Sequence, residues 1–211
     1  MKSDRRLPGK EMNNPHRIND AYADFLTDWL FERLSPTKKT YFVTLTFEHE
    51  AQRRQRRQAE GLSAGAYEMK AFDHLYNLIS RKLVGRNYHR RSHEHRLPHV
   101  ATFLDAEGSR HWRSSGELTN LHFHSIWIVE GSDATVFEDV MTLNGSLADA
   151  RPSLSFDAID VRQFDLNNEG ECKRVMAYAS KLTGFNNQNL SLGRDFEIYP
   201  INQMDRSSEQ V

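Results

Sequence analysis

The residues LHFHSIWIV, from Leu121 to Val129, form the most strand-like stretch of the sequence. β-branched and aromatic side chains dominate it, and these residue types are enriched in strands. Residues 99–106 (HVATFLDA) read as a second strand, and residues 107–120, rich in Gly, Ser, Arg and Asn, read as the turn or long hairpin loop that joins the two. The sequence therefore predicts that these two strands pair as an antiparallel hairpin.

Outward from this pair, helical and strand-like patterns alternate in a defined order. Apolar residues recur at helical spacing from Ser63, an expected N-cap, to about Val84, and again over 133–143. Strand patterns occupy 41–47 (YFVTLTF) and 155–164. The order β-α-β-β-α-β predicts an α+β fold with a ferredoxin-like or RRM-like antiparallel sheet that carries its helices on one face.

The remaining segments complete the predicted organisation. An amphipathic helix is expected over 19–34, a charged polar connection over 52–62, a helix over 169–183 and a last strand over 194–199. We divide the chain into an N-terminal extension at 1–38 with one amphipathic helix, a single domain at 39–200, and a polar tail at 201–211.

Composition excludes several classes of protein. The 211 residues include one cysteine, Cys172, and carry a formal net charge of −1. The sequence contains no apolar run near the roughly 20 residues of a membrane span and no apolar leader at its start, so we expect a cytoplasmic protein without membrane contacts. One cysteine excludes an intramolecular disulfide and a CxxC metal site.

The near-neutral total conceals a strong asymmetry of charge. Residues 1–96 carry 19 Lys and Arg against 12 Asp and Glu, whereas residues 97–211 carry 9 against 17. Two dense basic runs lie in the first half. They contain Arg53, Arg54, Arg56 and Arg57, and then Arg81, Lys82, Arg86, Tyr88, Arg90 and Arg91. Such runs are typical of solvated surfaces or of a groove that follows a nucleic-acid backbone, with Tyr88 available for base stacking.

Two histidines in the central strand form a candidate metal site. Side chains alternate along a strand, so His122 and His124 project from one face about 7 Å apart. A hairpin centred near Ser114 and Ser115 would place Glu107 opposite His122 and Asp105 opposite His124. Either carboxylate could complete the ligand set. A mixed His-His-acid set suits Mn²⁺ or Mg²⁺, with Zn²⁺ or Co²⁺ as alternatives. The simpler interpretation is two half-exposed polar residues in a sheet.

A tyrosine and a lysine on the helix at 169–183 could serve the same site. Tyr178 and Lys181 stand three residues apart and so share a helix face. The alternative is structural, because Val175, Tyr178 and Leu182 also make an apolar stripe that would belong to the core.

Together, FVTLTF, HFH and Tyr-x-x-Lys resemble the three ordered motifs of HUH endonucleases, in particular the single-tyrosine rolling-circle replication initiators (Rep proteins). The resemblance covers residues 40–185 and rests on the order of the motifs more than on any one of them. It implies a divalent metal held by His122, His124 and an acid, which the family places variably, with Tyr178 as nucleophile. Lys181 matches the lysine that positions the phosphate or metal.

The resemblance also implies a reaction and its partners. The tyrosine would nick DNA and form a covalent 5′-phosphotyrosine, and strand rejoining would need no ATP. The substrate would be single-stranded or hairpin origin DNA of a plasmid or phage, with a host helicase and polymerase as further partners and no small-molecule substrate. A transposase or relaxase would share this chemistry.

Two interpretations compete with a nicking enzyme. A non-catalytic single-stranded nucleic-acid-binding module on an RRM-like sheet would expose aromatic residues on its central strands, and Phe123 and Trp127 share one face. A His-rich metal-binding or sensing protein would use His89, His93 and His95, although no carboxylates match these residues.

Overall fold

The computed structural model describes residues 24–47, 50–106, 120–142, 156–164, 169–180 and 193–200. A first helix covers residues 24–31. The elements that follow are β1 (Lys38–Phe47), α2 (Glu50–Glu60), α3 (Ala66–Val84), the 3₁₀ helix η2 (Arg91–Arg96), β2 (His99–Asp105), β3 (His122–Glu130), the 3₁₀ helix η4 (Gly131–Asp133), α4 (Ala134–Met141), β4 (Phe156–Gln163), α6 (Glu169–Ala179) and β5 (Phe196–Tyr199).

The five strands form one sheet in the order β4-β1-β3-β2-β5, and every neighbouring pair is antiparallel. β3 is the middle strand, with β1 on one side and β2 on the other, and the β2–β3 pairing is the antiparallel hairpin that the sequence predicted. This α+β arrangement is compatible with a ferredoxin-like sheet. β5 adds a fifth strand at the edge, where it pairs with β2.

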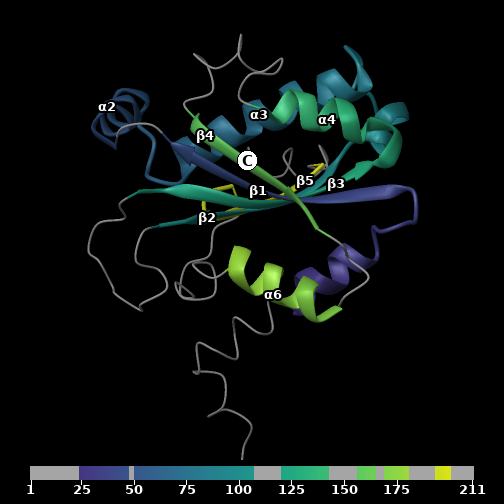
Figure 1. Ribbon diagram of the computed structural model, residues 1–211. Helices are drawn as coiled ribbons and strands as arrows, with labels where there is room; N and C mark the ends of the chain where they lie inside the picture. Colours follow the sequence, from purple (N-terminus) through teal and green to yellow (C-terminus); the bar gives the residue numbers. More distant parts are fainter. Residues whose placement is uncertain are drawn as a thin grey trace, which may run out of the picture.

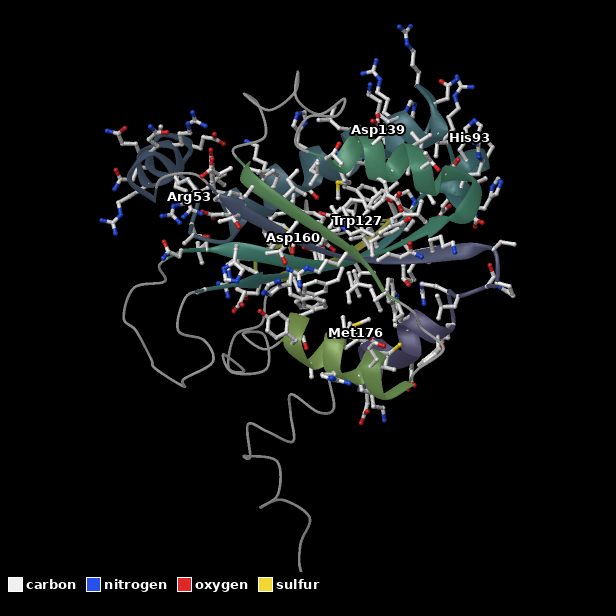
Figure 2. All side chains as sticks on the ribbon, in the orientation of Figure 1. Arg53, His93, Trp127, Asp139, Asp160 and Met176 are labelled. Carbon is white, nitrogen blue, oxygen red and sulfur yellow. The ribbon has the colours of Figure 1, made fainter. Side chains whose placement is uncertain are left out.

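Helices cover both faces of the sheet, and the two helices of the β-α-β-β-α-β pattern share one face, as expected. α3 and α4 lie on one face, and α6 lies with the helix of residues 24–31 on the other (Figure 1). Strand alternation supplies an apolar surface to each layer, so Trp127 packs under α3 and α4 whereas Met176 of α6 packs on the opposite side (Figure 2). The metal-site histidines belong to the second face.

The helix of residues 24–31 is part of the core. Leu26, Trp29 and Leu30 are buried in one cluster with Ile126 and Met176. Burying a Leu or Ile side chain stabilises the fold by about 1.5–3 kcal/mol, so this helix contributes to the stability of the sheet face that it covers.

α2 is a helix where the sequence pattern predicted a polar connection. Its mean composition is polar, but Arg53 and Arg57 stand four residues apart and turn inward, with 3 % and 8 % of their surfaces exposed. Both guanidinium groups face Glu68, a fully buried residue of α3. Buried charged contacts with Glu68, and not an apolar stripe, therefore hold α2 against the rest of the fold.

The next helix also begins later than predicted. Gly65 precedes α3 in place of the expected cap Ser63, and its backbone N–H donates to Glu68 at 2.8 Å. Gly65 has a φ of 88°, a conformation that favours glycine. Within the described residues, no helix combines the length and apolar character needed to cross a membrane.

Candidate metal centre

His122, His124 and Asp105 converge on one face of the sheet. Period-two alternation along β3 puts both imidazoles on the face that α6 partly covers, and antiparallel pairing places Asp105 of β2 directly across from His122. The Oδ2 atom of Asp105 lies 3.1 Å from His122 Nε2 and 3.3 Å from His124 Nε2. Asp105 is fully buried, His124 is 3 % exposed and His122 is half-buried.

These separations are those of ligands around one small cation. Two donor atoms that each lie about 2.1 Å from an ion are about 3.0 Å apart at a right angle and about 3.4 Å apart at the tetrahedral angle. The Asp105 oxygen lies at such a distance from each of the two imidazole nitrogens, and the three donor atoms all lie within 4.8 Å of one another. The cluster could therefore hold one divalent ion.

Hydrogen bonds at the other ring nitrogens orient both imidazoles. His122 Nδ1 lies 2.9 Å from the carbonyl oxygen of Asn120. A carbonyl can only accept, so Nδ1 carries a proton and donates it, which leaves Nε2 as the ring nitrogen that a metal could bind. Thr44 of β1 contacts His124 Nδ1 through its hydroxyl at 3.3 Å. Outer hydrogen bonds of this kind fix the ring orientation of metal-binding histidines.

The backbone conformation of Asn120 brings its carbonyl oxygen to the His122 ring. Its φ is 50°, in the left-handed region that asparagine tolerates better than most residues. The turn of the chain at Asn120, directly before β3, directs its carbonyl at His122. The sequence pattern did not mark Asn120, although an Asn before a strand is a recognised turn signal, and it placed Thr44 only within the strand motif FVTLTF.

Tyr178 of α6 lies beside the cluster. Its ring centroid is 4.9 Å from that of His124 and 6.0 Å from that of Phe42. The side chain is 36 % exposed, whereas Cys172, Met176 and Ala179 of the same helix are fully buried. The apolar stripe of α6 therefore excludes Tyr178, and the alternative of a core tyrosine is wrong.

The register of the β2–β3 hairpin corrects one expectation about the acid. Asp105 pairs with His122 and Phe103 with His124, a shift of two residues from the predicted pairing of Glu107 with His122. The predicted face is retained, because a shift by an even number preserves alternation. Among the described residues Asp105 is the acid at the site, and Glu107 and Lys181 lie outside the described residues.

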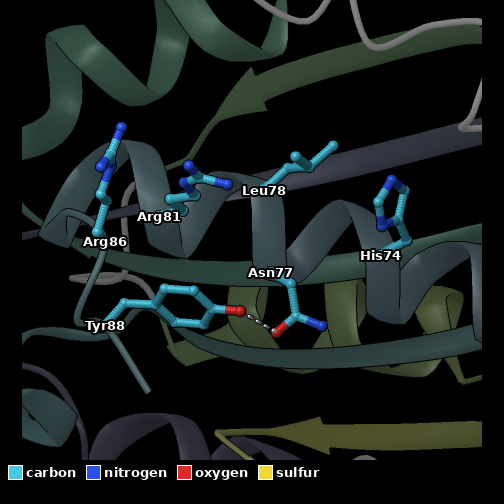
Figure 3. Close-up of a pocket in the computed structure, with 6 residues that line it drawn as sticks. All are labelled: His74, Asn77, Leu78, Arg81, Arg86 and Tyr88. Atoms are coloured by element: carbon cyan, nitrogen blue, oxygen red, sulfur yellow. Dashed lines mark hydrogen bonds between the residues drawn. The ribbon is translucent and has the colours of Figure 1, made fainter. Parts of the chain in front are cut away.

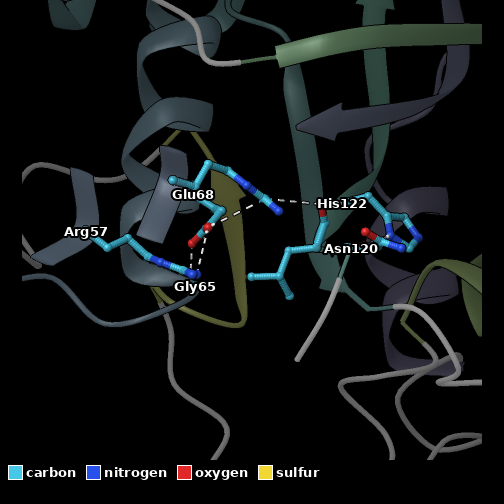
Figure 4. A network of polar contacts seen from close by, with 7 residues as sticks. Arg57, Gly65, Glu68, Asn120 and His122 are labelled. Atoms are coloured by element: carbon cyan, nitrogen blue, oxygen red, sulfur yellow. Dashed lines mark hydrogen bonds and ion pairs between the residues drawn. The ribbon is translucent and has the colours of Figure 1, made fainter. Parts of the chain in front are cut away.

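A buried polar network links α2 and α3 to the start of β3. Glu68 accepts from Arg57 Nη1 at 3.1 Å, and Arg53 Nη1 lies 3.7 Å from the same carboxylate oxygen (Figure 4). Arg53 also donates to the carbonyl of Leu121 at 3.4 Å, and Leu121 directly precedes His122, the first residue of β3. A role as surface phosphate contacts is therefore wrong for Arg53 and Arg57, whereas Arg54 and Arg56 are exposed.

The second basic run lies away from the metal centre. Arg81, Arg86 and Tyr88 line an open cleft on the outer side of α3, in the layer on the other face of the sheet (Figure 3). Lys82, Arg90 and Arg91 are exposed in the same part of the chain.

The competing interpretations also have structural outcomes. Phe123 and Trp127 are fully buried under α3 and α4, so the prediction that they face solvent and stack on bases is wrong. Of the three histidines offered as a separate metal site, His93 and His95 lie in η2 and His89 precedes it. Within the described residues they form no cluster of metal-binding side chains, and the Asp105, His122 and His124 cluster stands apart from them.

Comparison with protein families, with curated proteins and with solved structures finds no match to this chain. The cluster of Asp105, His122 and His124 and the tyrosine beside it are therefore the features of the molecule that indicate a function.

Proposed function

We propose that this chain is a metal-dependent, single-tyrosine nicking and joining endonuclease of the HUH type that acts on single-stranded or hairpin DNA. One observation carries the proposal. Tyr178, from a helix more than fifty residues further along the chain, lies against His124 of a three-ligand cluster. Neither a structural tyrosine nor a simple metal-binding site requires a half-exposed phenol at that position.

The donor set suits a hard or borderline divalent ion. One carboxylate oxygen and two imidazole nitrogens fit Mn²⁺, Mg²⁺ or Zn²⁺, and three protein ligands leave further positions open for phosphate oxygens. When bound, such an ion polarises a phosphodiester and offsets the negative charge that develops on the leaving oxygen. Asp105, His122 and His124 would hold it, and the hydrogen bonds of Asn120 and Thr44 would keep both rings in position.

The reaction itself would belong to Tyr178. Its phenolate oxygen attacks the phosphorus, a bond forms between that oxygen and phosphorus, and the bond from phosphorus to the 3′ oxygen breaks. The phenol proton leaves to solvent and the departing 3′ oxygen takes one up. The 5′-phosphotyrosine retains the energy of the diester, so attack by a 3′-hydroxyl rejoins the strand without ATP.

The site is accessible to a DNA strand from the β4 side. Thr46 pairs with His122 on one side and with Ala158 of β4 on the other, so all three share one face of the sheet. Both Thr46 and Ala158 are exposed. A flexible single strand can approach across this open part of the sheet, whereas a base-paired duplex would hold its phosphates away from Tyr178. We propose replication initiation on a plasmid or phage as the biological role, with a helicase and polymerase supplied by the host.

The test is formation of a covalent adduct. The protein is incubated with Mn²⁺ and a pool of 3′-labelled single-stranded and hairpin oligonucleotides of random loop sequence, and labelled protein is then detected in denaturing gels. A 5′-phosphotyrosine leaves the label on the protein, so we expect a labelled band that EDTA, His122→Ala and Tyr178→Phe each abolish. Tyr67→Phe is the matched control, because Tyr67 is buried in the α3 layer. Absence of any adduct, or an adduct that survives Tyr178→Phe, contradicts the proposal, and DNA binding without an adduct would favour a non-catalytic module.

A further inference from the structure

A cleft on the outer side of α3 gathers positive charge and an aromatic ring. His74, Asn77, Leu78 and Arg81 occupy positions i, i+3, i+4 and i+7 of α3, so they form one stripe along the helix. Arg86 and Tyr88, from the segment after the helix, face this stripe and close the cleft (Figure 3).

The cleft is built to hold its aromatic ring in a fixed place. The hydroxyl of Tyr88 donates to the side-chain oxygen of Asn77 at 3.2 Å. The ring remains half-buried and is not part of the hydrophobic core. One edge of the ring is therefore anchored on α3 while the rest borders the opening.

The electrostatics of the cleft favour an anion. Among the described residues that line it, none is acidic, and Arg81 and Arg86 are both exposed. The surrounding run from 81 to 96 carries six Lys and Arg against one acidic residue, Glu94. Guanidinium groups bind phosphate through paired N–H donors, and aromatic rings stack on bases. A nucleic acid supplies both groups along one chain, whereas inorganic phosphate would leave Tyr88 without a ligand.

The cleft and the metal centre are far apart. α3 packs on the face that carries Trp127, and the ligand cluster lies on the opposite face. Tyr76 of α3 donates to the carbonyl of Pro98 at 3.1 Å, directly before β2 begins, whereas Asp105 ends the same strand. The six residue-to-residue steps from His99 to Asp105, at about 3.3 Å each, separate the two ends of β2 by about 20 Å. A nucleic acid seated in the cleft therefore cannot present the same phosphates to Tyr178.

We infer that this cleft is a second nucleic-acid-binding site, in which Arg81 and Arg86 contact backbone phosphates and Tyr88 stacks on a base of a segment other than the one at the metal centre. The site contributes affinity and not chemistry. It goes beyond the proposed nicking reaction and does not depend on it, because a protein that binds DNA without cutting it could use the same cleft.

The experiment measures binding with chemistry switched off. Fluorescence anisotropy in EDTA follows the Tyr178→Phe protein with a labelled single-stranded oligonucleotide and with a duplex of the same sequence. The test variant adds Arg81→Ala and Arg86→Ala. The matched control adds Lys39→Ala and Lys70→Ala, which remove the same charge from exposed residues outside the cleft.

We expect the test variant to raise Kd by about tenfold and to make the slope of log K against log salt shallower by about 1.4 for the single strand, or about 1.8 for the duplex. The control should stay within about twofold of the parent. Tyr88→Leu should weaken single-strand binding by about fivefold or more while Tyr88→Phe does not, because stacking needs the ring and not the hydroxyl. An effect of Tyr88→Leu on the single strand but not on the duplex identifies a single-stranded ligand.

Equal affinities of the test and control variants for both DNAs overturn the inference. Its failure is distinguishable from failure of the proposed function. If the unsubstituted protein forms no adduct but its DNA binding still depends on Arg81 and Arg86, only the nicking proposal fails. If the protein forms the adduct normally but its DNA binding does not depend on Arg81 and Arg86, only the proposed second site fails. Thermal unfolding of each variant verifies that the exposed substitutions leave the fold intact.

Discussion

Binding of a divalent ion should stabilise the fold, and Asp105→Asn should abolish that stabilisation. An ion that binds only the folded state adds about 2.7 kcal/mol to the free energy of unfolding at a concentration of 100 times Kd. For a chain of this length each kcal/mol moves Tm by about 2–4 °C, so saturating Mn²⁺ should raise Tm by about 5–11 °C. Asp105 supplies the only anionic oxygen among the three described ligands, and the substitution removes its charge while nearly preserving its shape.

Without a bound metal ion, Asp105→Asn should not lower Tm. Asp105 is fully buried beside two imidazoles, and burying a charged carboxylate costs desolvation free energy even when it has partners. In EDTA, Asp105→Asn should therefore have a Tm equal to or above that of the parent, while in Mn²⁺ it falls below. Functional sites commonly carry such a cost in stability.

Differential scanning fluorimetry with Mn²⁺, Mg²⁺ and EDTA measures both effects. Asp160→Asn is the matched control, because Asp160 lies on the same face of the sheet across Thr44 but is exposed and paired with Arg162. It should retain the full metal-dependent shift. A metal-induced rise in Tm of the same size in Asp105→Asn and in the control would show that the ion binds elsewhere and that the ligand assignment is wrong.

Three further substitutions test the surroundings of the site. Glu68→Gln leaves two buried guanidinium groups without their carboxylate and should lower the free energy of unfolding by about 3–5 kcal/mol in denaturant titrations. Glu60→Gln, at an exposed ion pair, is the control and should lower it by under about 1 kcal/mol. Similar losses in both variants would contradict a buried charge cluster at Glu68. Burial, reinforced by two nearby cationic side chains, lowers the pKa of His99 to about 4 from 6.5. The unfolded chain therefore takes up a proton that the folded protein does not, so stability is lost as the pH falls from about 6.5 to about 4, by roughly 1–2 kcal/mol after allowance for partial exposure. His99→Gln should remove that part of the pH dependence in thermal unfolding, and an unchanged pH profile would contradict the shifted pKa. Thr44→Val removes the hydroxyl that contacts His124 and should weaken Mn²⁺ binding by about tenfold in calorimetric titrations; an unaltered Kd would show that Thr44 does not position the ring.

The local patterns that were predicted correctly depend on geometry that a short segment fixes by itself. Strand alternation placed His122 and His124 on one face, because the backbone of β3 imposes a period of two. The same alternation along β2 correctly placed the Asp105 side chain on that face of the sheet. Its exact partner could not be predicted, because the register of a hairpin depends on the loop, and the connection at 107–119 is too long for a two-residue turn to fix the pairing.

The parts that were missed depend on partners distant in sequence. α2 reads as a solvated connection because Arg53 and Arg57 are charged, and only Glu68, on the next helix, explains their burial. The buried face of α6 could not be chosen from spacing either, since spacing permits the alternative stripe of Val175, Tyr178 and Leu182 as readily as the buried set of Cys172, Met176 and Ala179. Spacing identifies candidate faces, and only tertiary packing selects among them.

The arrangement of layers separates two kinds of surface. Acidic and imidazole groups converge on the face beside α6, while the exposed arginines Arg81 and Arg86 lie in the α3 layer on the opposite face. The net charge of −1 is thus the sum of regions that differ in sign and in position. A near-neutral total does not argue against contact with nucleic acid when the charges are separated in this way.

Anomalous diffraction from crystals soaked in Mn²⁺ would examine the ligand cluster itself. We predict one strong anomalous peak about 2.0–2.3 Å from a carboxylate oxygen of Asp105 and from the Nε2 atoms of His122 and His124, with the side chain of Tyr178 beside it. A saturating soak that leaves this position without a peak, or that places the ion on other residues, would contradict the assignment of these three side chains as a metal centre.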